Sequence, residues 1–208
     1  SVQTLDGAFM DFFESRRTSA SFQTDVRVAE GHVVTAGYDW QDDEGNVRDR
    51  FDTLPTWTRS NRALFAQYVG EFGAQDVQAS VRRDDNDQYG GNTTGGLAWG
   101  MSLAHVFRVT ASVGTAFKAP TFNELYFPFY GNPTLVPEES ETWELGVGQQ
   151  KTDWRWQLNA FETRVDDLIV YDIALFMANN LEEARIRGAE LTGSVTIAEW
   201  NVSGAASW

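Results

Sequence analysis

The chain has 208 residues, and its 16 Lys and Arg face 30 Asp and Glu, a formal net charge of −14 with a pI near 4.4. This acidity argues against nucleic-acid phosphates and anionic lipid surfaces as partners, and the absence of cysteine excludes disulfides, thiolate metal sites and cysteine nucleophiles. No apolar run approaches the roughly 18 residues of a membrane-spanning helix, and the opening SVQTLDGAFM lacks the features of a signal peptide.

Bulky residues alternate with polar or small ones through most of the chain, the pattern of β-strands with two unlike faces. In VVTAGYDWQ, for example, Tyr38 and Trp40 share one parity and Asp39 takes the other. No segment shows a helical period of comparable strength. The alternation predicts eleven strands, at about 7–14, 19–29, 32–41, 61–72, 75–84, 94–101, 106–116, 141–150, 154–163, 184–196 and 200–208.

The connections between these strands alternate in length. Short turns fall at AEG, FGA, SLAH, KTD and AE, whereas longer excursions follow Asp42, cross DNDQYGGN, span 116–140 and follow Arg164. Short turns at one end and long loops at the other indicate an up-and-down meander.

The two parities favour a membrane barrel over a soluble meander. The polar parity holds too many charged and amide groups for a closed apolar core, whereas a wet lumen accommodates them, and Trp and Tyr near strand ends suit an interfacial girdle. We therefore expect an all-β, antiparallel up-and-down transmembrane β-barrel. Since bacterial single-chain barrels have even strand numbers, eleven strands indicate part of a larger barrel. The polar set is Asp39, Gln67, Glu71, Gln78, Arg82, Arg108, Lys118, Glu144 and Gln150.

One stretch carries a family resemblance: ASVGTAFKAPTFNELYFPFYGNPTLVPEESETWELGV resembles the barrel of TonB-dependent outer-membrane receptors. The segments SVRRDDNDQYG, TRVDDLIVYD and NLEEARIRGAELTGS are similar to the cobalamin (vitamin B12) receptor branch. The resemblance implies a barrel of about 22 strands, of which residues 1–208 form one part, the N-terminal plug domain and the other strands being absent.

The same resemblance implies an active-transport receptor in the outer membrane of a Gram-negative bacterium, surrounded by outer-membrane lipid. It would bind a scarce, bulky nutrient at its outer loops and import it with energy from TonB, which contacts the plug. Cobalamin is the favoured ligand, and a ferric siderophore is the alternative.

The quoted loop holds four of the chain's 5 prolines, which cannot lie in a paired central strand and so keep a long excursion extended. Its aromatic residues would fold over the barrel mouth. The favoured interpretation is that the loop is structural. The alternative is a ligand site formed by Tyr126, Phe129, Tyr130 and Asn132.

Three acidic residues, Asp84, Asp85 and Asp87, bring oxygens together that can ligate a hard cation such as calcium. Their spacing does not match an EF-hand loop. A solvated acidic loop, or one with ion pairs to Arg82 and Arg83, is the favoured interpretation, and no covalent cofactor is expected.

Catalytic residues find little support in the sequence. His32 and His105 fall beside short turns without a partner at motif spacing, and Asp166 and Asp167 would point to opposite faces of a strand. We therefore do not expect an enzyme. An outer-membrane barrel enzyme and a purely structural β-barrel are the more distant alternatives.

Overall fold

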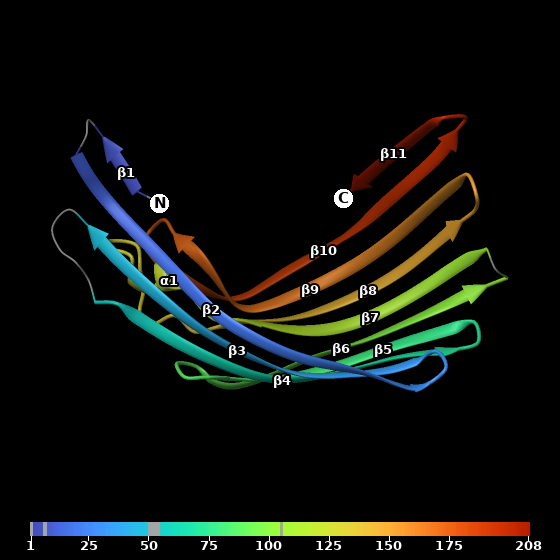
Figure 1. Ribbon diagram of the computed structural model, residues 1–208. Helices are drawn as coiled ribbons and strands as arrows, with labels where there is room; N and C mark the ends of the chain where they lie inside the picture. The colour runs from blue at the N-terminus through green and yellow to red at the C-terminus, as the bar shows by residue number, and fades with distance from the viewer. Residues whose placement is uncertain (1, 6–7, 50–54, 105) are drawn as a thin grey trace.

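A computed structural model describes residues 2–5, 8–49, 55–104 and 106–208, which form one curved antiparallel sheet (Figure 1). Its eleven strands follow one another across the sheet in chain order, which confirms the expected all-β, up-and-down architecture. The strands are β1 Val2–Leu5, β2 Ala8–Ala29, β3 His32–Asp49, β4 Trp57–Phe72, β5 Gln75–Asn86, β6 Gly90–Leu103, β7 Phe107–Lys118, β8 Glu138–Gln150, β9 Trp154–Asp172, β10 Met177–Ile197 and β11 Trp200–Ser207.

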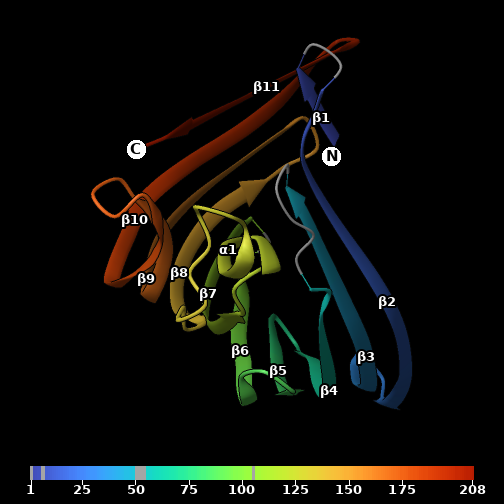
Figure 2. The same cartoon turned by 90° about the vertical axis from the view of Figure 1, so that its left-hand side faces the viewer.

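The sheet is bent into an open trough with unlike ends (Figure 1). The turns after β2, β4, β6, β8 and β10 gather at one end, hereafter the short-turn end, and the other connections gather at the long-loop end. Seen from the long-loop end, the helix α1 (Phe122–Tyr126) lies inside the curve (Figure 2). In the described part of the chain, no helix has the length and apolarity that a bilayer crossing needs.

The register keeps apolar residues on one face from strand to strand. Tyr38 pairs with Leu64 across β3 and β4, and Ala66 pairs with Val81 across β4 and β5. Large apolar side chains on this convex face stay open to the surroundings: Leu64 is 65% exposed and Leu145 66% exposed. Because the opposite, concave face carries the polar parity, the sheet separates an apolar exterior from a polar interior, as the alternation predicts.

Several strands are longer than the sequence predicts. The expected strands 7–14 and 19–29 belong to one strand, β2. The number of strands nevertheless equals the eleven expected, because β1, which was not expected, lies before β2. The 20-residue loop expected after Arg164 is wrong, since β9 continues to Asp172 and β10 starts at Met177. The extension of β3 is polar on both faces, whereas the outer part of β9 places apolar residues on both faces, with Leu168 and Val170 at one parity and Ile169 at the other. Neither extension shows the alternation by which strands are recognised.

The exposed apolar face generates the first prediction. Replacing Leu64 by Arg should lower the free energy of unfolding in lipid vesicles by about 2–4 kcal/mol, because a charge near the bilayer midplane is costly on the lipid side of a barrel. Gln67→Arg, on the concave side of the same strand, is the matched control and should be tolerated. The free energy of unfolding of both variants is measured by denaturant titration, with the folded fraction read from heat-modifiable migration on gels. Equal losses in the two variants would contradict the assignment of faces.

Candidate functional site

The connection between β7 and β8, residues 119–137, is hereafter the mouth loop. Its second residue, Pro120, is fully buried, and the helix α1 follows. A capping box starts this helix: the Thr121 hydroxyl accepts a bond from the Glu124 amide at 3.2 Å, and the Glu124 carboxylate accepts one from the Thr121 amide at 2.7 Å. The loop therefore has a fixed local structure, although the sequence analysis predicts no helix there.

A small apolar core holds the mouth loop against the sheet. Leu125 and Leu135 of the loop meet Ala178 of β10, and their side chains are at most 3% exposed. Tyr130 and Ile169 pack against this cluster. The core therefore lies beneath the loop rather than along the sheet, whose own faces are apolar only on the outside.

Hydrogen bonds attach the mouth loop to β10. The Asn132 side-chain amide donates to the Ala178 carbonyl at 3.0 Å, and the Ala178 amide donates to the Tyr130 carbonyl at 2.9 Å. Asn180 accepts from the Val136 amide at 3.0 Å and donates to the Val136 carbonyl at 3.0 Å. Its amide group also donates to the Asp167 carbonyl at 2.6 Å, so Asn180 links the loop to both strands of the β9–β10 hairpin.

The other side of the mouth loop rests on β3 and β4. Arg59 donates from Nη1 to the Pro120 carbonyl at 2.7 Å, and Trp57 stacks on Tyr126 with ring centroids 4.3 Å apart. Gly45 permits the approach, because a Cβ there would lie 2.5 Å from the Phe122 ring. The loop thus bridges the concave face from β4 to β10.

Below the loop, charged and amide side chains of β2 to β5 form a connected network, hereafter the polar ladder. Arg17 binds Asp43 through Nε at 2.6 Å, and Arg82 binds Asp84 through Nε at 2.9 Å. Arg82 also binds Asp39. The charges on the concave face are therefore largely compensated within the sheet. The ladder comprises Arg17, Asp39, Gln41, Asp43, Asn61, Arg82 and Asp84.

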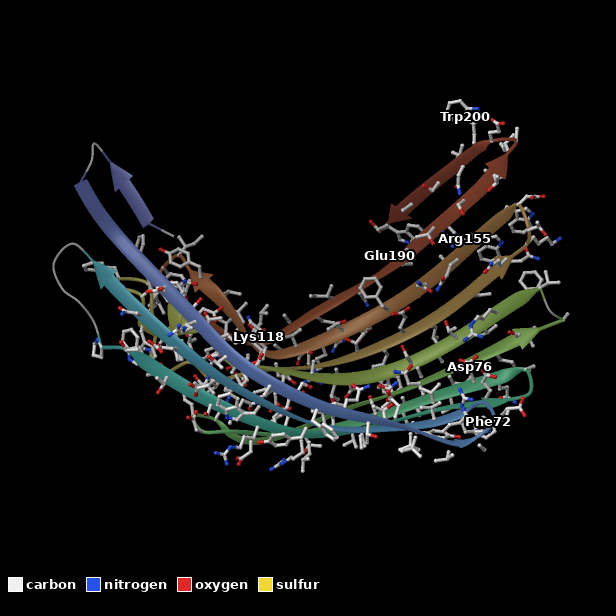
Figure 3. All side chains as sticks on the ribbon, viewed as in Figure 1. Phe72, Asp76, Lys118, Arg155, Glu190 and Trp200 are labelled. Atoms are coloured by element: carbon white, nitrogen blue, oxygen red, sulfur yellow. The ribbon has the colours of Figure 1, made fainter. Side chains whose placement is uncertain are left out.

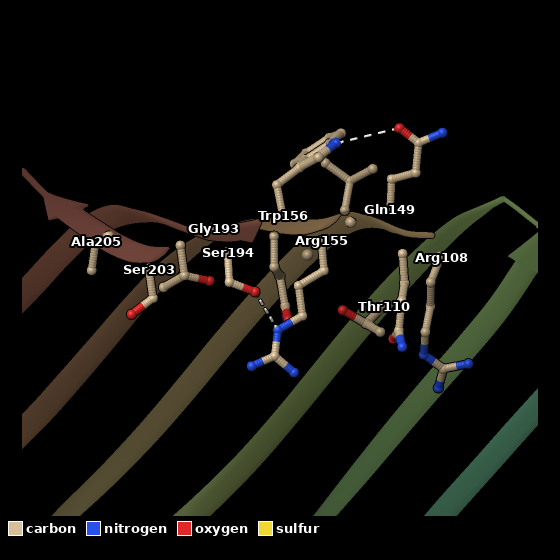
Figure 4. A pocket seen from close by; sticks show the side chains of 16 residues that line it. Arg108, Thr110, Gln149, Arg155, Trp156, Gly193, Ser194, Ser203 and Ala205 are labelled. Carbon is tan, nitrogen blue, oxygen red and sulfur yellow. Dashed lines mark hydrogen bonds between the residues drawn. The ribbon is translucent and has the colours of Figure 1, made fainter. Parts of the chain in front are cut away.

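Two of the hollows on the concave face bear on the site. One, of about 410 Å³, lies between the polar ladder and the mouth loop, and Arg59 and Asn86 are among its lining residues. The other, of about 750 Å³, lies between β7 and β11 (Figure 4). There Arg155 and Arg108 project to the same side, and Arg155 donates to the Ser194 hydroxyl at 3.1 Å.

The hollows lie toward opposite ends of the trough. Figure 3 shows Arg155 and Asp76 toward the short-turn end, whereas Lys118, at the start of the mouth loop, lies nearer the long-loop end. Lys118 pairs with Glu138 at 3.0 Å where β7 and β8 separate. The hollow under the mouth loop is thus the one nearer the long-loop end.

The longer loop expected across DNDQYGGN is wrong, because β5 ends at Asn86 and β6 begins at Gly90, so that only residues 87–89 form a turn between them. Tyr89 lies in this turn, and its hydroxyl is buried without a hydrogen-bond partner among the described residues. Burial raises the pKa of this phenol, and the nearby Arg59 opposes the shift only in part. Tyr89 therefore stays neutral at physiological pH and presents an unused donor beneath the loop.

Three of the four residues expected to bind ligand are engaged in packing. Tyr126 stacks on Trp57, Tyr130 stacks on Tyr171 at 5.8 Å, and Asn132 is only 9% exposed. Phe129, in contrast, is 91% exposed and has φ of 62°. The structure therefore gathers the four in one loop but leaves Phe129 alone open to solvent.

The three acidic residues considered for calcium do not converge. Asp84 binds Arg82 and Asn61, and the Asp87 carboxylate accepts a bond from the Ser60 amide at 3.0 Å. Asp85 follows Asp84 on a strand and so points to the opposite face. Nowhere in the described ranges do three or more His, Cys, Asp or Glu form a group that could hold a metal ion. These residues do not fit a shared calcium site, and calcium binding itself stays a prediction.

The sequence pattern did not point to Arg59, Trp57 or Asn180 as site residues. The strand expected from residue 61 begins at Trp57 in the structure. The sequence therefore did not show that Arg59 lies on the same polar face of β4 as Asn61. Asn180 fell within the loop expected after Arg164. His32 lies beside a short turn as expected, bonded to the Tyr68 hydroxyl at 2.7 Å, and His105 lies outside the described residues.

The fold and its faces define the wall of a membrane β-barrel, and comparison with known proteins identifies the family. The TonB dependent receptor-like beta-barrel family matches residues 3–208, so the chain belongs to it. Barrels of this family are outer-membrane proteins of Gram-negative bacteria, and the named relatives are transporters and receptors rather than enzymes.

Two curated relatives are vitamin B12 transporters named BtuB. The one from Photobacterium profundum is 32% identical over 186 residues, covering 86% of this chain and 30% of that protein. The one from Vibrio cholerae is 34% identical over 164 residues, covering 77% of this chain and 26% of that protein. The chain thus spans less than a third of the length of these relatives.

Among solved structures, the siderophore receptor PirA from Pseudomonas aeruginosa superposes with a TM-score of 0.76. Its sequence identity is 20%, and the alignment covers 95% of this chain and 43% of that one. At this identity the likeness shows the fold alone.

The anchoring of the mouth loop can be tested at Asn180. Asn180→Ala should destabilise the loop locally by about 1–3 kcal/mol, because the Val136 amide and two carbonyls lose their partner. Hydrogen exchange across residues 119–137 should accelerate, while the β4–β5 hairpin stays protected. Asn179→Ala, the neighbouring position on the opposite face, is the control. Unchanged exchange in the Asn180 variant would argue against the anchor.

The unpartnered phenol of Tyr89 gives another prediction. Tyr89→Phe should raise the free energy of unfolding by about 1 kcal/mol, because it removes a buried polar group and keeps the ring. The pKa of Tyr89 is raised in the fold, so the unfolded state loses its phenol proton first as the pH rises through about 10. The wild type should therefore lose stability above this pH, whereas the Phe variant lacks this loss and should be less sensitive to alkali. Denaturant unfolding at neutral and alkaline pH measures both. A less stable variant would mean that water occupies the site.

Proposed function

We propose that this chain is a segment of the barrel wall of an outer-membrane receptor that imports a scarce, bulky nutrient, and that the nutrient is a cobalamin. The observation that carries the choice of nutrient is sequence likeness: 32% identity over 86% of the chain to a vitamin B12 transporter. Binding and import belong to the full-length receptor, and its location is the outer membrane.

The geometry supports a role for the mouth loop in holding the nutrient. The loop is fixed to β4 and β10 over a hollow of about 410 Å³, so the side chains it presents are held in place before a ligand arrives. Preorganisation of this kind reduces the entropy lost on binding. Energy would enter through contact of TonB with the plug domain of the full-length receptor.

Phe129 is the residue of the loop that we assign to ligand contact. A bulky residue at φ of 62° is strained, and strain of this kind persists where the surroundings enforce it. The enforced conformation exposes an aromatic ring that a corrin or another large apolar group could cover. Tyr126, Tyr130 and Asn132 would act by holding the loop in shape.

The nutrient is tested by binding to the full-length receptor in detergent. Equilibrium dialysis with cyanocobalamin should give tight binding that an excess of ferric siderophore does not displace, and an arm with chelator tests the calcium prediction. Siderophore binding without cobalamin binding would overturn the choice of nutrient and leave the family intact.

The role of Phe129 is tested by Phe129→Asn. Asparagine accepts positive φ, so the variant keeps the loop conformation while removing the ring. Cyanocobalamin affinity should fall about tenfold, as expected for loss of one buried aromatic contact. Phe129→Tyr keeps the ring and should bind like the wild type. Wild-type affinity in the Asn variant would remove Phe129 from the site.

A further inference from the structure

Arg59 is a buried cation on the concave face of β4. It is 9% exposed, and it lines the hollow beneath the mouth loop. Its position opposite Asp43 places it on the polar parity of the sheet, among the residues of the polar ladder. An arginine is rarely buried to this degree unless it is paired.

The guanidinium of Arg59 has few partners. One of its five N–H donors binds the Pro120 carbonyl at 2.7 Å, and the rings of Phe122 and Tyr89 lie 5.0 and 6.0 Å from its central carbon. It forms no ion pair with any described residue, in contrast to Arg17 and Arg82 of the same hollow. Most of its donors are therefore available.

The carboxylates that line the hollow are already paired. Asp43 receives two bonds from Arg17, at 2.6 and 3.1 Å, and one from Gln41 at 2.9 Å. Asp84 receives bonds from Arg82 and Asn61. Among the described residues, Arg59 therefore has no carboxylate in an ion pair with it, and an unpaired buried charge is costly.

We propose that the hollow beneath the mouth loop binds an oxyanion group, of the phosphate class, through Arg59. A planar guanidinium presents parallel N–H groups that match two oxygens of such an anion, and the hollow of about 410 Å³ has room for it. The hydroxyl of Thr94, which also lines the hollow, adds a neutral donor, whereas that of Thr115 is bonded to the Gly95 backbone. The plain alternative is that Arg59 only fastens the mouth loop through Pro120.

Two sources can supply this chemistry: a free oxyanion such as inorganic phosphate, or a phosphodiester carried by the transported nutrient. The second rests on the proposed function, because cobalamin contains a phosphodiester whereas cobinamide, a corrinoid without the nucleotide, does not. The first is independent of the nutrient.

The first arm of the test uses inorganic phosphate and the full-length receptor in detergent. At constant ionic strength, replacing chloride by phosphate should raise the midpoint of thermal unfolding of the wild type, because a ligand that binds only the folded state stabilises it. Arg59→Gln should lose this response. Arg83→Gln, an exposed position bonded to Thr93 on the opposite face, is the charge-matched control and should keep it.

The second arm compares cyanocobalamin with cobinamide. If the phosphodiester is the occupant, Arg59→Gln should weaken cyanocobalamin about tenfold and leave cobinamide unchanged, since charge-assisted bonds are among the strong ones. If the cyanocobalamin affinity is unchanged but the phosphate response is lost, the occupant is a free oxyanion. If the wild type binds no corrinoid, the proposed nutrient fails and the phosphate arm still decides the present proposal.

The proposal is overturned if phosphate leaves the wild-type midpoint unchanged and both corrinoids respond equally to Arg59→Gln. It is also overturned if the Gln variant keeps the full phosphate response. Should Arg59→Gln not fold, Arg59→Lys retains the charge without the planar fork and should give a weaker phosphate response. An unaltered response in that variant would again contradict the site.

Discussion

Cross-strand register is the constraint on which the rest of this structure depends. Side chains alternate between faces with a period of two, so a slip of one residue in any pair would turn apolar side chains inward and charges outward. Pairs such as Tyr38 with Leu64 keep the apolar face continuous over neighbouring strands. The same register brings Arg17 to Asp43 and Arg82 to Asp39 on the concave side, so the polar ladder follows from the strand order.

The mouth loop adds to the sheet what a single layer cannot provide. The sheet has no apolar core of its own, because its apolar face points outward, and the buried cluster of Leu125, Leu135 and Ala178 forms only where the loop covers β10. Contacts at Arg59 and Trp57 hold its other side. The loop connects strands that are far apart in the sheet, and its buried Pro120, the helix α1 and its stacked rings hold it in one conformation across the concave face.

The sequence predicts the fold well where one face of a strand is apolar and the other polar, and poorly where the two faces are alike. Strands such as 32–41 and 75–84 were recognised from alternation, whereas the extension of β3 through Asp42 to Asp49 and the outer part of β9 were taken for loops. The long loop that holds the candidate ligand residues was placed between the correct two strands, β7 and β8. The unpaired state of Arg59 and the isolation of Phe129 could not be predicted, because each depends on which distant side chains already have partners.

The length of the β9–β10 hairpin has a mechanical consequence. Its strands have 19 and 21 residues, whereas a tilted barrel strand crosses a bilayer with about 9–11, so much of the hairpin stands beyond the hydrocarbon layer as continuous sheet. A force applied at its tip is shared by the many backbone hydrogen bonds between β9 and β10 and reaches the embedded part with little bending. Ala178 and Asn180 lie near this tip, so any tilt of the hairpin carries the mouth loop with it.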